Sequence, residues 1–283
     1  MMKRIIQLIS TVLFNGYLVG FAKGSIYMGG LKVTCVPVLN CYSCPGALGS
    51  CPIGSLQGVL KSKNSNFSFY VLGSIMLFGI VLGRVICGFL CPFGFLQDLL
   101  YKIPLKKHNE FKFDKQLRYL KYVVLVVLVI LGPMFITNQF GEGDPLFCKW
   151  LCPAGTLEAG IPLAIANDGI RGALGFMFSY KVAILIVILL LSIKIYRPFC
   201  KFLCPLGGIY GLFNRFSFYQ MSVDHNTCIN CNRCIEACKM NVDVINNINS
   251  AECIRCGDCV KVCPVDAIDS GFVKEFNKIK NEG

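Results

Sequence analysis

Four long apolar runs separated by polar segments set the pattern of this chain. Each run approaches the roughly 20 residues that a helix needs to cross the hydrocarbon core of a bilayer. The sequence therefore predicts four membrane-spanning helices, at about residues 5–21, 69–86, 119–136 and 176–196. Lys3 and Arg4 precede the first run as in a signal peptide, but no small-residue cleavage site follows, so we interpret this run as a signal anchor.

Residues 157–178 form a fifth apolar segment, which Pro162, Asn167, Asp168 and Arg171 interrupt. The segment is too polar for another span and too apolar for a free loop, so the pattern predicts a re-entrant or interfacial amphipathic helix. Asp168 and Arg171 could line a quinone pocket, although a solvated polar stripe on an interfacial helix also explains them.

Composition and charge agree with a membrane protein. Of 283 residues, 54% are hydrophobic and only 16% are charged, which is too apolar for a soluble domain of this size. Seven lysines and arginines lie within residues 101–121, whereas the loop before the fourth run has two basic and four acidic residues. Basic loops stay in the cytoplasm, so we expect a multi-pass cell-membrane protein with both termini cytoplasmic. Four lysines in the first loop oppose this orientation. Because the basic residues flank apolar runs, a nucleic-acid partner is not expected.

Eight of the 18 cysteines form two consecutive CxxCxxCxxxC runs, at residues 228–238 and 253–263. This pattern is typical of a protein with two 4Fe-4S clusters, in which the fourth cysteine of each run reaches the other cluster. A zinc module would use separated CxxC pairs instead. The predicted ligands of the first cluster are Cys228, Cys231, Cys234 and Cys263. Those of the second are Cys253, Cys256, Cys259 and Cys238.

The upstream cysteines recur in CGFLCPFG at 87–94, CKWLCPAG at 148–155 and CKFLCPLG at 200–207, with a degenerate copy, SCPIGSLQG, at 50–58. The copies alternate with the apolar runs. This order predicts a tandem duplication, residues 1–100 and 101–212, before a ferredoxin-like domain at 219–272 and a tail at 273–283. Proline ends one helix and begins the next, so we expect the second cysteine of each motif near a helix N-cap, where backbone N–H groups favour an anionic thiolate centre.

Membrane topology pairs these motifs in space. The predicted inner cluster has four ligands at the cytoplasmic ends of the spans, Cys87, Cys91, Cys200 and Cys204. The predicted outer cluster is held by Cys44, Cys51, Cys148 and Cys152. Cys35 and Cys41 stay unassigned: either could replace Cys44, or the two could form a disulfide on the oxidising face. The metal stays open too, since soft thiolates also suit zinc or cuprous copper and free cysteines are often simply buried.

Several other chemistries lack their residues. The two histidines, His108 and His225, lie outside the apolar runs, and no CxxCH motif occurs. These absences exclude a c-type haem site and paired haem ligands inside the spans. The sequence also has no dinucleotide-binding fingerprint or phosphate loop, so a bound nucleotide substrate is not expected.

The CxxxCPxG motifs in a four-span domain, followed by an 8-iron ferredoxin-like tail that ends in CPVDAI, resemble the NapH/NosR group of membrane-bound polyferredoxins. The resemblance covers nearly the whole chain. It implies an α-helical membrane protein with a C-terminal α+β ferredoxin domain and up to four 4Fe-4S clusters. Members of that group serve as electron-transfer subunits, some linked to quinone and some to extracytoplasmic reductases or flavoproteins. This chain departs from simpler members in its third full CxxxCP motif and its CYSCPGALGSCP insert, which supply ligands on the outer face.

The sequence therefore predicts an electron-transfer subunit of a membrane oxidoreductase complex. A cytoplasmic donor such as a ferredoxin or dehydrogenase would reduce the ferredoxin-like domain, and an extracytoplasmic flavin- or haem-bearing subunit would receive the electrons. A relay is needed because the bilayer core is about 30 Å thick. One alternative is a quinol- or quinone-linked subunit. Another, from a different class, is a copper-handling or redox-sensing membrane protein. No catalytic residue is predicted.

Overall fold

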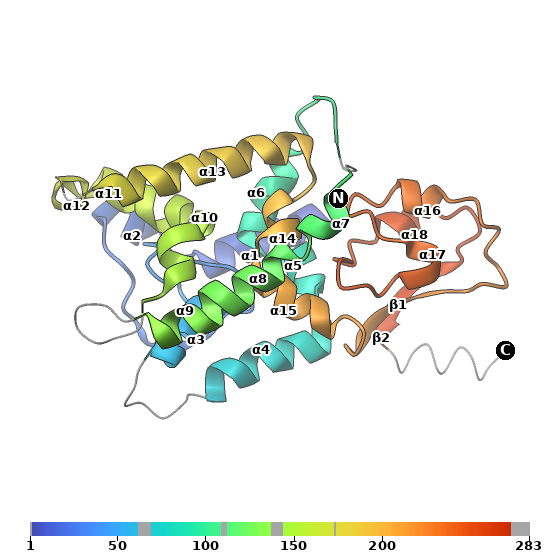
Figure 1. Cartoon of the computed structure of the whole chain (residues 1–283), viewed down its shortest axis with the longest axis horizontal. Coiled ribbons are helices and arrows are strands. Elements are labelled where there is room, and N and C mark those ends of the chain that lie inside the picture. The colour runs from blue at the N-terminus through green and yellow to red at the C-terminus, as the bar shows by residue number, and fades with distance from the viewer. Residues whose placement is uncertain (1, 62–68, 109–111, 137–143, 173, 273–283) are drawn as a thin grey trace.

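The computed structural model describes residues 2–61, 69–108, 112–136, 144–172 and 174–272. The chain is mostly helical, and a small domain formed by its C-terminal part lies at one end of the helical part (Figure 1). The tail at 273–283 lies outside the described residues.

The first half of the helical part, up to residue 100, contains six α-helices and one short 3-10 helix within the described residues. Their bounds are α1 Met2–Phe14, α2 Leu18–Lys23, η1 Gly30–Val33, α3 Pro52–Lys61, α4 Phe69–Leu82, α5 Val85–Phe89 and α6 Pro92–Leu100.

The second half repeats this alternation of long apolar and short cysteine-bearing helices. Its elements are α7 Asp114–Leu117, α8 Leu120–Val124, η2 Leu125–Leu131, α9 Gly132–Phe135, η3 Phe147–Leu151, α10 Pro153–Gly155, η4 Thr156–Gly160, α11 Ile161–Ala166, α12 Asp168–Gly172, α13 Phe176–Lys194, α14 Pro198–Phe202 and α15 Pro205–Phe213. The elements η2, η3 and η4 are π-helical. Figure 1 shows α2, α10, α11 and α12 at the end far from the small domain, with α5, α14 and α15 nearer to it.

Two helices of the described chain are long and apolar enough to cross a membrane. They are the continuous helix Asp114–Phe135 and α13, with 22 and 19 residues. They coincide with the third and fourth predicted spans. The helices α1 and α4 have 13 and 14 residues, or about 20 Å each at 1.5 Å per residue, which is shorter than a bilayer core.

The first two apolar runs are broken by contacts to other segments. The first run divides between α1 and α2, because Phe14 and Tyr17 exchange backbone hydrogen bonds with the cysteine-bearing loop at Leu48 and Gly46. The second run turns at Gly83, whose φ of +55° favours glycine, and a Cβ there would lie 2.7 Å from Oδ1 of Asn214.

The segment expected to form one interfacial helix is instead a series of short helices, η4, α11 and α12, before α13 begins. Asn167 separates α11 from α12. Its side chain accepts hydrogen bonds from the backbone N–H groups of Gly169 and Ile170, as an N-cap does.

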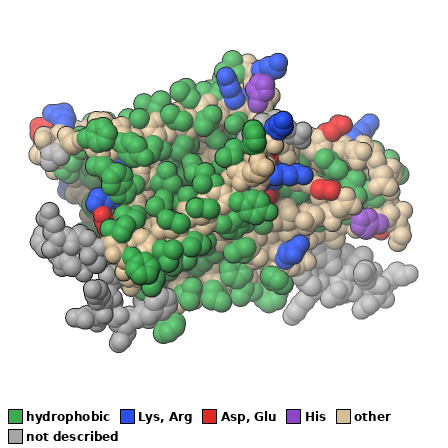
Figure 2. Space-filling model, in the orientation of Figure 1, with side chains coloured by type: hydrophobic (Ala, Val, Ile, Leu, Met, Phe, Trp, Pro, Cys, Tyr) green, Lys and Arg blue, Asp and Glu red, His purple; other side chains and the backbone are tan. Residues whose placement is uncertain are grey.

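The face of the helical part drawn in Figure 2 is apolar over most of its length, and the charged side chains on this face gather toward its ends. Large exposed side chains include Leu8 and Val12 of α1, Leu77 of α4, and Val187 and Leu190 of α13, each more than half exposed. Exposed apolar surface of this extent indicates contact with lipid.

The small domain contains a two-stranded antiparallel sheet of β1 Tyr219–Val223 and β2 Ile268–Phe272, paired from Tyr219 with Phe272 to Val223 with Ile268. Three short helices lie between the strands, α16 Arg233–Glu236, α17 Val244–Asn247 and α18 Asp258–Val262. The core of this domain is small and includes cysteines: Met221, Cys234, Val244, Ile248, Cys259 and Ile268.

Buried ionic and polar contacts join the small domain to the helical part. Arg84 forms an ion pair with Glu252 at 3.0 Å and donates to the carbonyl oxygen of Ala251. In the opposite direction, Arg255 donates to the backbone oxygens of Leu82 and Asn214. Arg84 is fully buried, so the two parts are docked by contacts that water does not reach.

Candidate metal centres

The eight C-terminal cysteines line two separate small cavities. One cavity contacts Cys228, Cys231, Cys234 and Cys263, and the other contacts Cys238, Cys253, Cys256 and Cys259. The cysteines thus group in space as the spacing predicts for the two ligand sets, with the fourth cysteine of each run beside the other run.

Equivalent backbone conformations shape the two cysteine loops. Asn230 and Asn232 of the first run have φ values of 52° and 59°, and Arg255 and Gly257 at the same positions of the second run have 52° and 76°. Such left-handed residues turn successive backbone N–H groups inward, toward an anion. In the second run, the Arg255 N–H donates to Sγ of Cys253 at 3.4 Å.

The four cysteines of the predicted inner set are brought together in the core between the two halves. Cys87, Cys91, Cys200 and Cys204 are each at most 8% exposed. Burial raises the pKa of Cys204 well above its ordinary value, and the neighbouring thiolates of Cys200 and Cys87 raise it further. Four thiols at such close range favour a bound metal centre, which would relieve their mutual repulsion as thiolates.

The second cysteine of each motif begins a helix, as expected. Cys91, Cys152 and Cys204 are the N-caps of α6, α10 and α15, each with proline at the first position. The hydrogen bonds also explain the glycine of the CPxG sequence. The Gly155 N–H donates to Sγ of Cys152 and the Gly207 N–H donates to Sγ of Cys204, both at 3.4 Å. The CPxG sequence thus supplies a backbone donor to its own thiolate.

Two buried arginines each reach from one half of the helical part to an inner cysteine of the other half. Arg84 lies three residues before Cys87 but donates to the backbone oxygen of Cys200 at 2.9 Å. Arg197 lies three residues before Cys200 and donates to the backbone oxygen of Cys87. Carboxylates hold both guanidinium groups, because Arg197 pairs with Asp98 at 2.6 Å and Arg84 pairs with Glu252. This reciprocal arrangement surrounds the inner thiols with positive charge.

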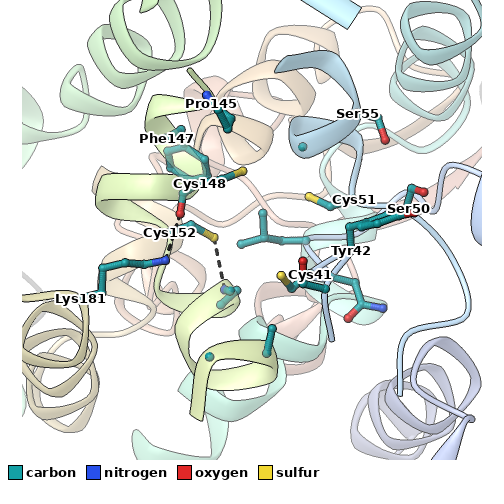
Figure 3. A pocket seen from close by; sticks show the side chains of 18 of the residues that line it. Cys41, Tyr42, Ser50, Cys51, Ser55, Pro145, Phe147, Cys148, Cys152 and Lys181 are labelled. Atoms are coloured by element: carbon teal, nitrogen blue, oxygen red, sulfur yellow. Dashed lines mark hydrogen bonds between the residues drawn. The ribbon is translucent and has the colours of Figure 1, made fainter. Parts of the chain in front are cut away.

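The outer cysteines lie around a cavity of about 560 Å³ between α3, η3, α10 and the loop before α3. Four cysteines line it, Cys41, Cys51, Cys148 and Cys152, and Figure 3 shows their sulfur atoms directed into the same space. Lys181 lies at its edge, where its Nζ donates to the backbone oxygen of Cys148 at 3.1 Å.

Cys44 and Cys35 do not line this cavity. Cys44 is buried with Ala47 and Ala159 and lies 3.5 Å from Oδ1 of Asn15. Cys35 forms a β-bridge with Ser50. None of the described cysteines is joined to another in a disulfide. Of the open alternatives for the outer set, the geometry therefore brings Cys41 to the other three cysteines and leaves Cys44 aside.

Glu158 positions Cys41. Its Oε2 accepts a hydrogen bond from the backbone N–H of Cys41 at 2.9 Å. Burial raises the pKa of Glu158 to about 8. A neutral carboxyl group next to an anionic thiolate centre avoids the repulsion that a carboxylate would cause.

Two glutamines at the centres were not predicted from the sequence. Gln57 donates to Sγ of Cys148 at 3.2 Å, and Gln97 donates to Sγ of Cys200 at 3.3 Å. Each glutamine follows the cysteine of a CPxG sequence by six residues, Cys51 and Cys91 respectively. This shared offset is the signal that could have identified them.

The cysteine sets fit iron–sulfur clusters better than single ions. A 4Fe-4S cluster needs four thiolates spread around a central volume. In the part of the chain that the structure describes, no three His, Cys, Asp or Glu side chains converge as ligands of one metal ion. At the outer set, a Cβ on Gly155 would lie 3.5 Å from Sγ of Cys41 and 3.8 Å from Sγ of Cys152, so this glycine keeps the space between the thiols open.

The residues considered for a quinone pocket lie elsewhere. Asp168 and Arg171 form an ion pair with each other in α12, with side chains 86% and 62% exposed. Neither lines the outer cavity.

Two family models match the chain. One, described as a 4Fe-4S binding domain, matches three segments, residues 67–109, 122–161 and 182–219. The other, described as a 4Fe-4S dicluster domain, matches residues 220–264. Together they cover the small domain and three of the CxxxCP motifs, and they establish 4Fe-4S clusters as the cofactors.

The chain is also similar to several curated proteins. It is 29% identical to an uncharacterised protein of Methanocaldococcus jannaschii, over 63% of this chain and 68% of the relative. It is 26% identical to the regulatory protein NosR of Stutzerimonas stutzeri, over 60% of this chain and 21% of the relative. It is 29% identical to the ferredoxin-type protein NapH of Haemophilus influenzae, over 58% and 50%. The chain thus spans from about a fifth to two thirds of these relatives. No solved structure matches it.

Proposed function

Because the chain belongs to the NapH/NosR-type polyferredoxins, which are ferredoxin-type electron-transport proteins, we propose that it carries electrons across a membrane through a series of four 4Fe-4S centres. The observation that carries this proposal is the succession of four cysteine sets through the molecule. Two sets lie in the small domain, one lies in the core between the repeats, and one lines the outer cavity.

Bound 4Fe-4S clusters would supply one-electron carriers. The ligands proposed for the small domain and the inner centre are the three sets derived from the sequence. For the outer centre we propose Cys41, Cys51, Cys148 and Cys152, which line one cavity. Two hydrogen bonds with the same spacing along the chain support Cys41 as a ligand of the outer centre. The Cys41 N–H donates to Glu158, six residues after Cys152, and the N–H of Phe147 donates to Gln57, six residues after Cys51.

The docked small domain would bring electrons to the inner centre. Its second cysteine set contacts the helical part, since Tyr196 packs with Met240, Val242 and Ile254 beside Cys253 and Cys256. The backbones meet where Gly88, next to Cys87, faces the carbonyl group of Ile254, next to Cys253. Cys87 and Cys253, which are proposed ligands of the two centres, are therefore each the chain neighbour of a residue that makes this direct contact.

Tyr210 links the inner centre to the outer one. It is fully buried, and its hydroxyl group donates to the backbone oxygen of Pro37, in the outer cysteine loop, at 3.0 Å. Tyr210 belongs to the same buried core as Cys87 and Cys51, one cysteine from each proposed centre. One continuous core thus contains cysteines of both centres.

The proposed orientation places the small domain and both termini in the cytoplasm. The density of basic residues within 101–121 supports it. The two tandem repeats, 1–100 and 101–212, would each contribute two spans, with α1 and α4 as the shorter ones. A cytoplasmic ferredoxin or dehydrogenase would then donate electrons, and an extracytoplasmic flavin- or haem-bearing subunit would accept them. We do not propose a copper-handling function, because both family models describe iron–sulfur binding.

The direct test is the iron and acid-labile sulfide content of anaerobically purified protein. Four cubane clusters predict about sixteen irons per chain, falling to about twelve in Cys41→Ser and in Cys148→Ser. Cys35→Ser, which changes a cysteine away from the cavity, is the matched control and should retain about sixteen. About eight irons in wild type and variants alike would confine the clusters to the small domain and refute the relay.

Vectorial transfer is tested in sealed proteoliposomes with an impermeant reductant outside and a trapped acceptor inside. Wild-type protein should reduce the trapped acceptor, and Cys148→Ser should not, while its small domain remains reducible. Equal rates in both proteins would show that electrons do not pass through the outer centre.

A further inference from the structure

Gln57 and Gln97 make the same set of contacts at the outer and inner centres. Both side chains are fully buried. Each amide nitrogen donates to a cysteine sulfur of the other repeat, Gln57 to Cys148 and Gln97 to Cys200. Each also lies 3.3 Å from a carbonyl oxygen four residues earlier, that of Ile53 or Phe93. This repetition at two sites indicates a shared role.

The backbone determines which end of each amide faces the sulfur. The N–H of Phe147 lies 3.1 Å from Oε1 of Gln57, and the N–H of Phe199 lies 3.2 Å from Oε1 of Gln97. A backbone N–H can only donate, so an oxygen must face it. The amide nitrogen is consequently directed at the sulfur. Each glutamine therefore clamps a Phe–Cys dipeptide at both the peptide nitrogen and the thiol.

We propose that Gln57 and Gln97 are matched positioning residues that raise the reduction potentials of the outer and inner centres, respectively, by donating a hydrogen bond to one ligand sulfur of each. This inference rests on the proposed function, because it takes Cys148 and Cys200 as cluster ligands. It goes beyond that function by assigning a role to two neutral side chains that bind no metal themselves.

The physical reason is charge. Reduction adds an electron to a centre that is already anionic, and the charge spreads onto its sulfur atoms. A donor directed at a sulfur stabilises the reduced state more than the oxidised state, so it raises the potential. Burial strengthens the effect, since no water competes for the sulfur.

In the second repeat, the position six residues after the CPxG cysteine is occupied by residues other than glutamine. Six residues after Cys152 lies Glu158, which accepts from Cys41 N–H, and six residues after Cys204 lies Tyr210, which donates to Pro37. Neither of these two hydrogen bonds involves a sulfur atom. Each membrane centre thus receives a hydrogen bond from one side-chain amide, in both cases from the first repeat. The reduction potential of each centre can therefore be changed by a single substitution without changing the other.

The test is a redox titration monitored by paramagnetic resonance on the complete, anaerobically purified protein. Cys204→Ser and Cys152→Ser assign the inner and outer signals by removing them. Gln97→Glu keeps the length of the side chain and an oxygen for the Phe199 N–H but loses the amide donor. Gln97→Leu removes both contacts. Gln116→Leu, which changes an exposed glutamine, is the matched control.

We expect both Gln97 variants to lower the midpoint potential of the inner signal and leave the outer signal unchanged, and Gln57→Glu to do the reverse. Unchanged potentials in variants that retain wild-type iron would overturn the inference. Loss of the inner signal from both Gln97 variants would also overturn it, because the glutamine would then only hold the ligand in place. Wild-type iron content separates these outcomes from failure of the proposed function, which would show as about eight irons in wild type itself.

Discussion

Replacing Gly88 by alanine is expected to push the small domain away from the inner centre. Gly88 belongs to α5, next to Cys87, and its missing side chain lets the backbone of residue 254 approach. A Cβ at this position would lie 2.5 Å from the carbonyl oxygen of Ile254. Because that oxygen belongs to the backbone, no side-chain rotation relieves the clash.

The size of the effect follows from two opposing contributions. An ordinary Cβ contact begins at 3.4 Å, so the two backbones must separate by about 0.9 Å. Overpacking of this kind costs about 1–3 kcal/mol. Alanine in a helix is favoured over glycine by about 0.5–1 kcal/mol, which offsets part of this cost. We expect a net loss of about 1–2 kcal/mol, concentrated at the docking interface.

The assay has two parts, thermal unfolding in detergent and the rate at which the inner paramagnetic signal appears after the small domain is reduced. Gly88→Ala should unfold at a lower temperature and show slower reduction of the inner signal, while its iron content stays at the wild-type value. Gly73→Ala is the matched control, because it lies in α4 with no atom within 4 Å of the added Cβ. This control should be neutral or slightly stabilised.

One result would refute the reasoning. If Gly88→Ala unfolds at or above the wild-type temperature and reduces its inner centre at the wild-type rate, then the close approach to Ile254 is not required for docking or for transfer. A slower rate in Gly73→Ala as well would show that the assay reports general damage to the helical part.

Three further substitutions or treatments have definite expected outcomes. Arg84→Met removes one of the two cations that pair with Glu252, the other being Lys121, so docking should weaken by less than the roughly 3–5 kcal/mol expected for a buried charge left with no partner, as measured by a thermal double-mutant cycle with Glu252→Gln. Asp98→Asn removes the carboxylate that holds Arg197, and the inner signal should broaden or be lost while the small-domain signals persist. Chelation of iron should unfold the small domain, whose core includes Cys234 and Cys259, before the helical part, as followed by limited proteolysis.

The grouping of the ferredoxin-like cysteines and of the inner cysteines in space could be predicted because their positions depend on local spacing, while their role as ligands stays a prediction. In the small domain, two runs with the same cysteine spacing have similar backbone conformations, and each cavity is lined by the expected four cysteines. The CxxxCP motifs place cysteines at helix junctions, which the N-caps of α6, α10 and α15 confirm. In both cases proline, glycine and cysteine determine the backbone within a few residues.

The outer set was harder to predict because tertiary contacts determine the loop that carries it. Nothing in the spacing of Cys35, Cys41 and Cys44 shows which sulfur faces the cavity. Contacts made by remote residues decide it, above all the hydrogen bond from Cys41 to Glu158, 117 residues away. The same limitation applies to Gln57 and Gln97, since their partners lie 91 and 103 residues away.

The structure changes the interpretation of some of the charged residues. Lys121 counts toward the basic loop that predicts orientation, yet the structure buries it completely against Glu252. Lys201 is likewise fully buried and pairs with Asp114. Such lysines say little about the orientation of the chain in the membrane, because ion pairs inside the protein hold them and the membrane surface does not.

These buried cations have a common location, and it connects cluster binding with docking. An iron–sulfur centre with four thiolate ligands is anionic, so burying one requires compensating positive charge nearby. Arg84 and Arg197 would supply it at the proposed inner centre, since each donates to the backbone oxygen of a cysteine of that set in the other half of the helical part. Arg84 is in turn held by Glu252 of the small domain. Arg197 is held by Asp98 of the helical part, whereas Arg84 is fully paired only when the small domain has docked. We therefore propose that complete charge compensation at the inner cysteines, and with it the proposed electron path, requires the docked small domain.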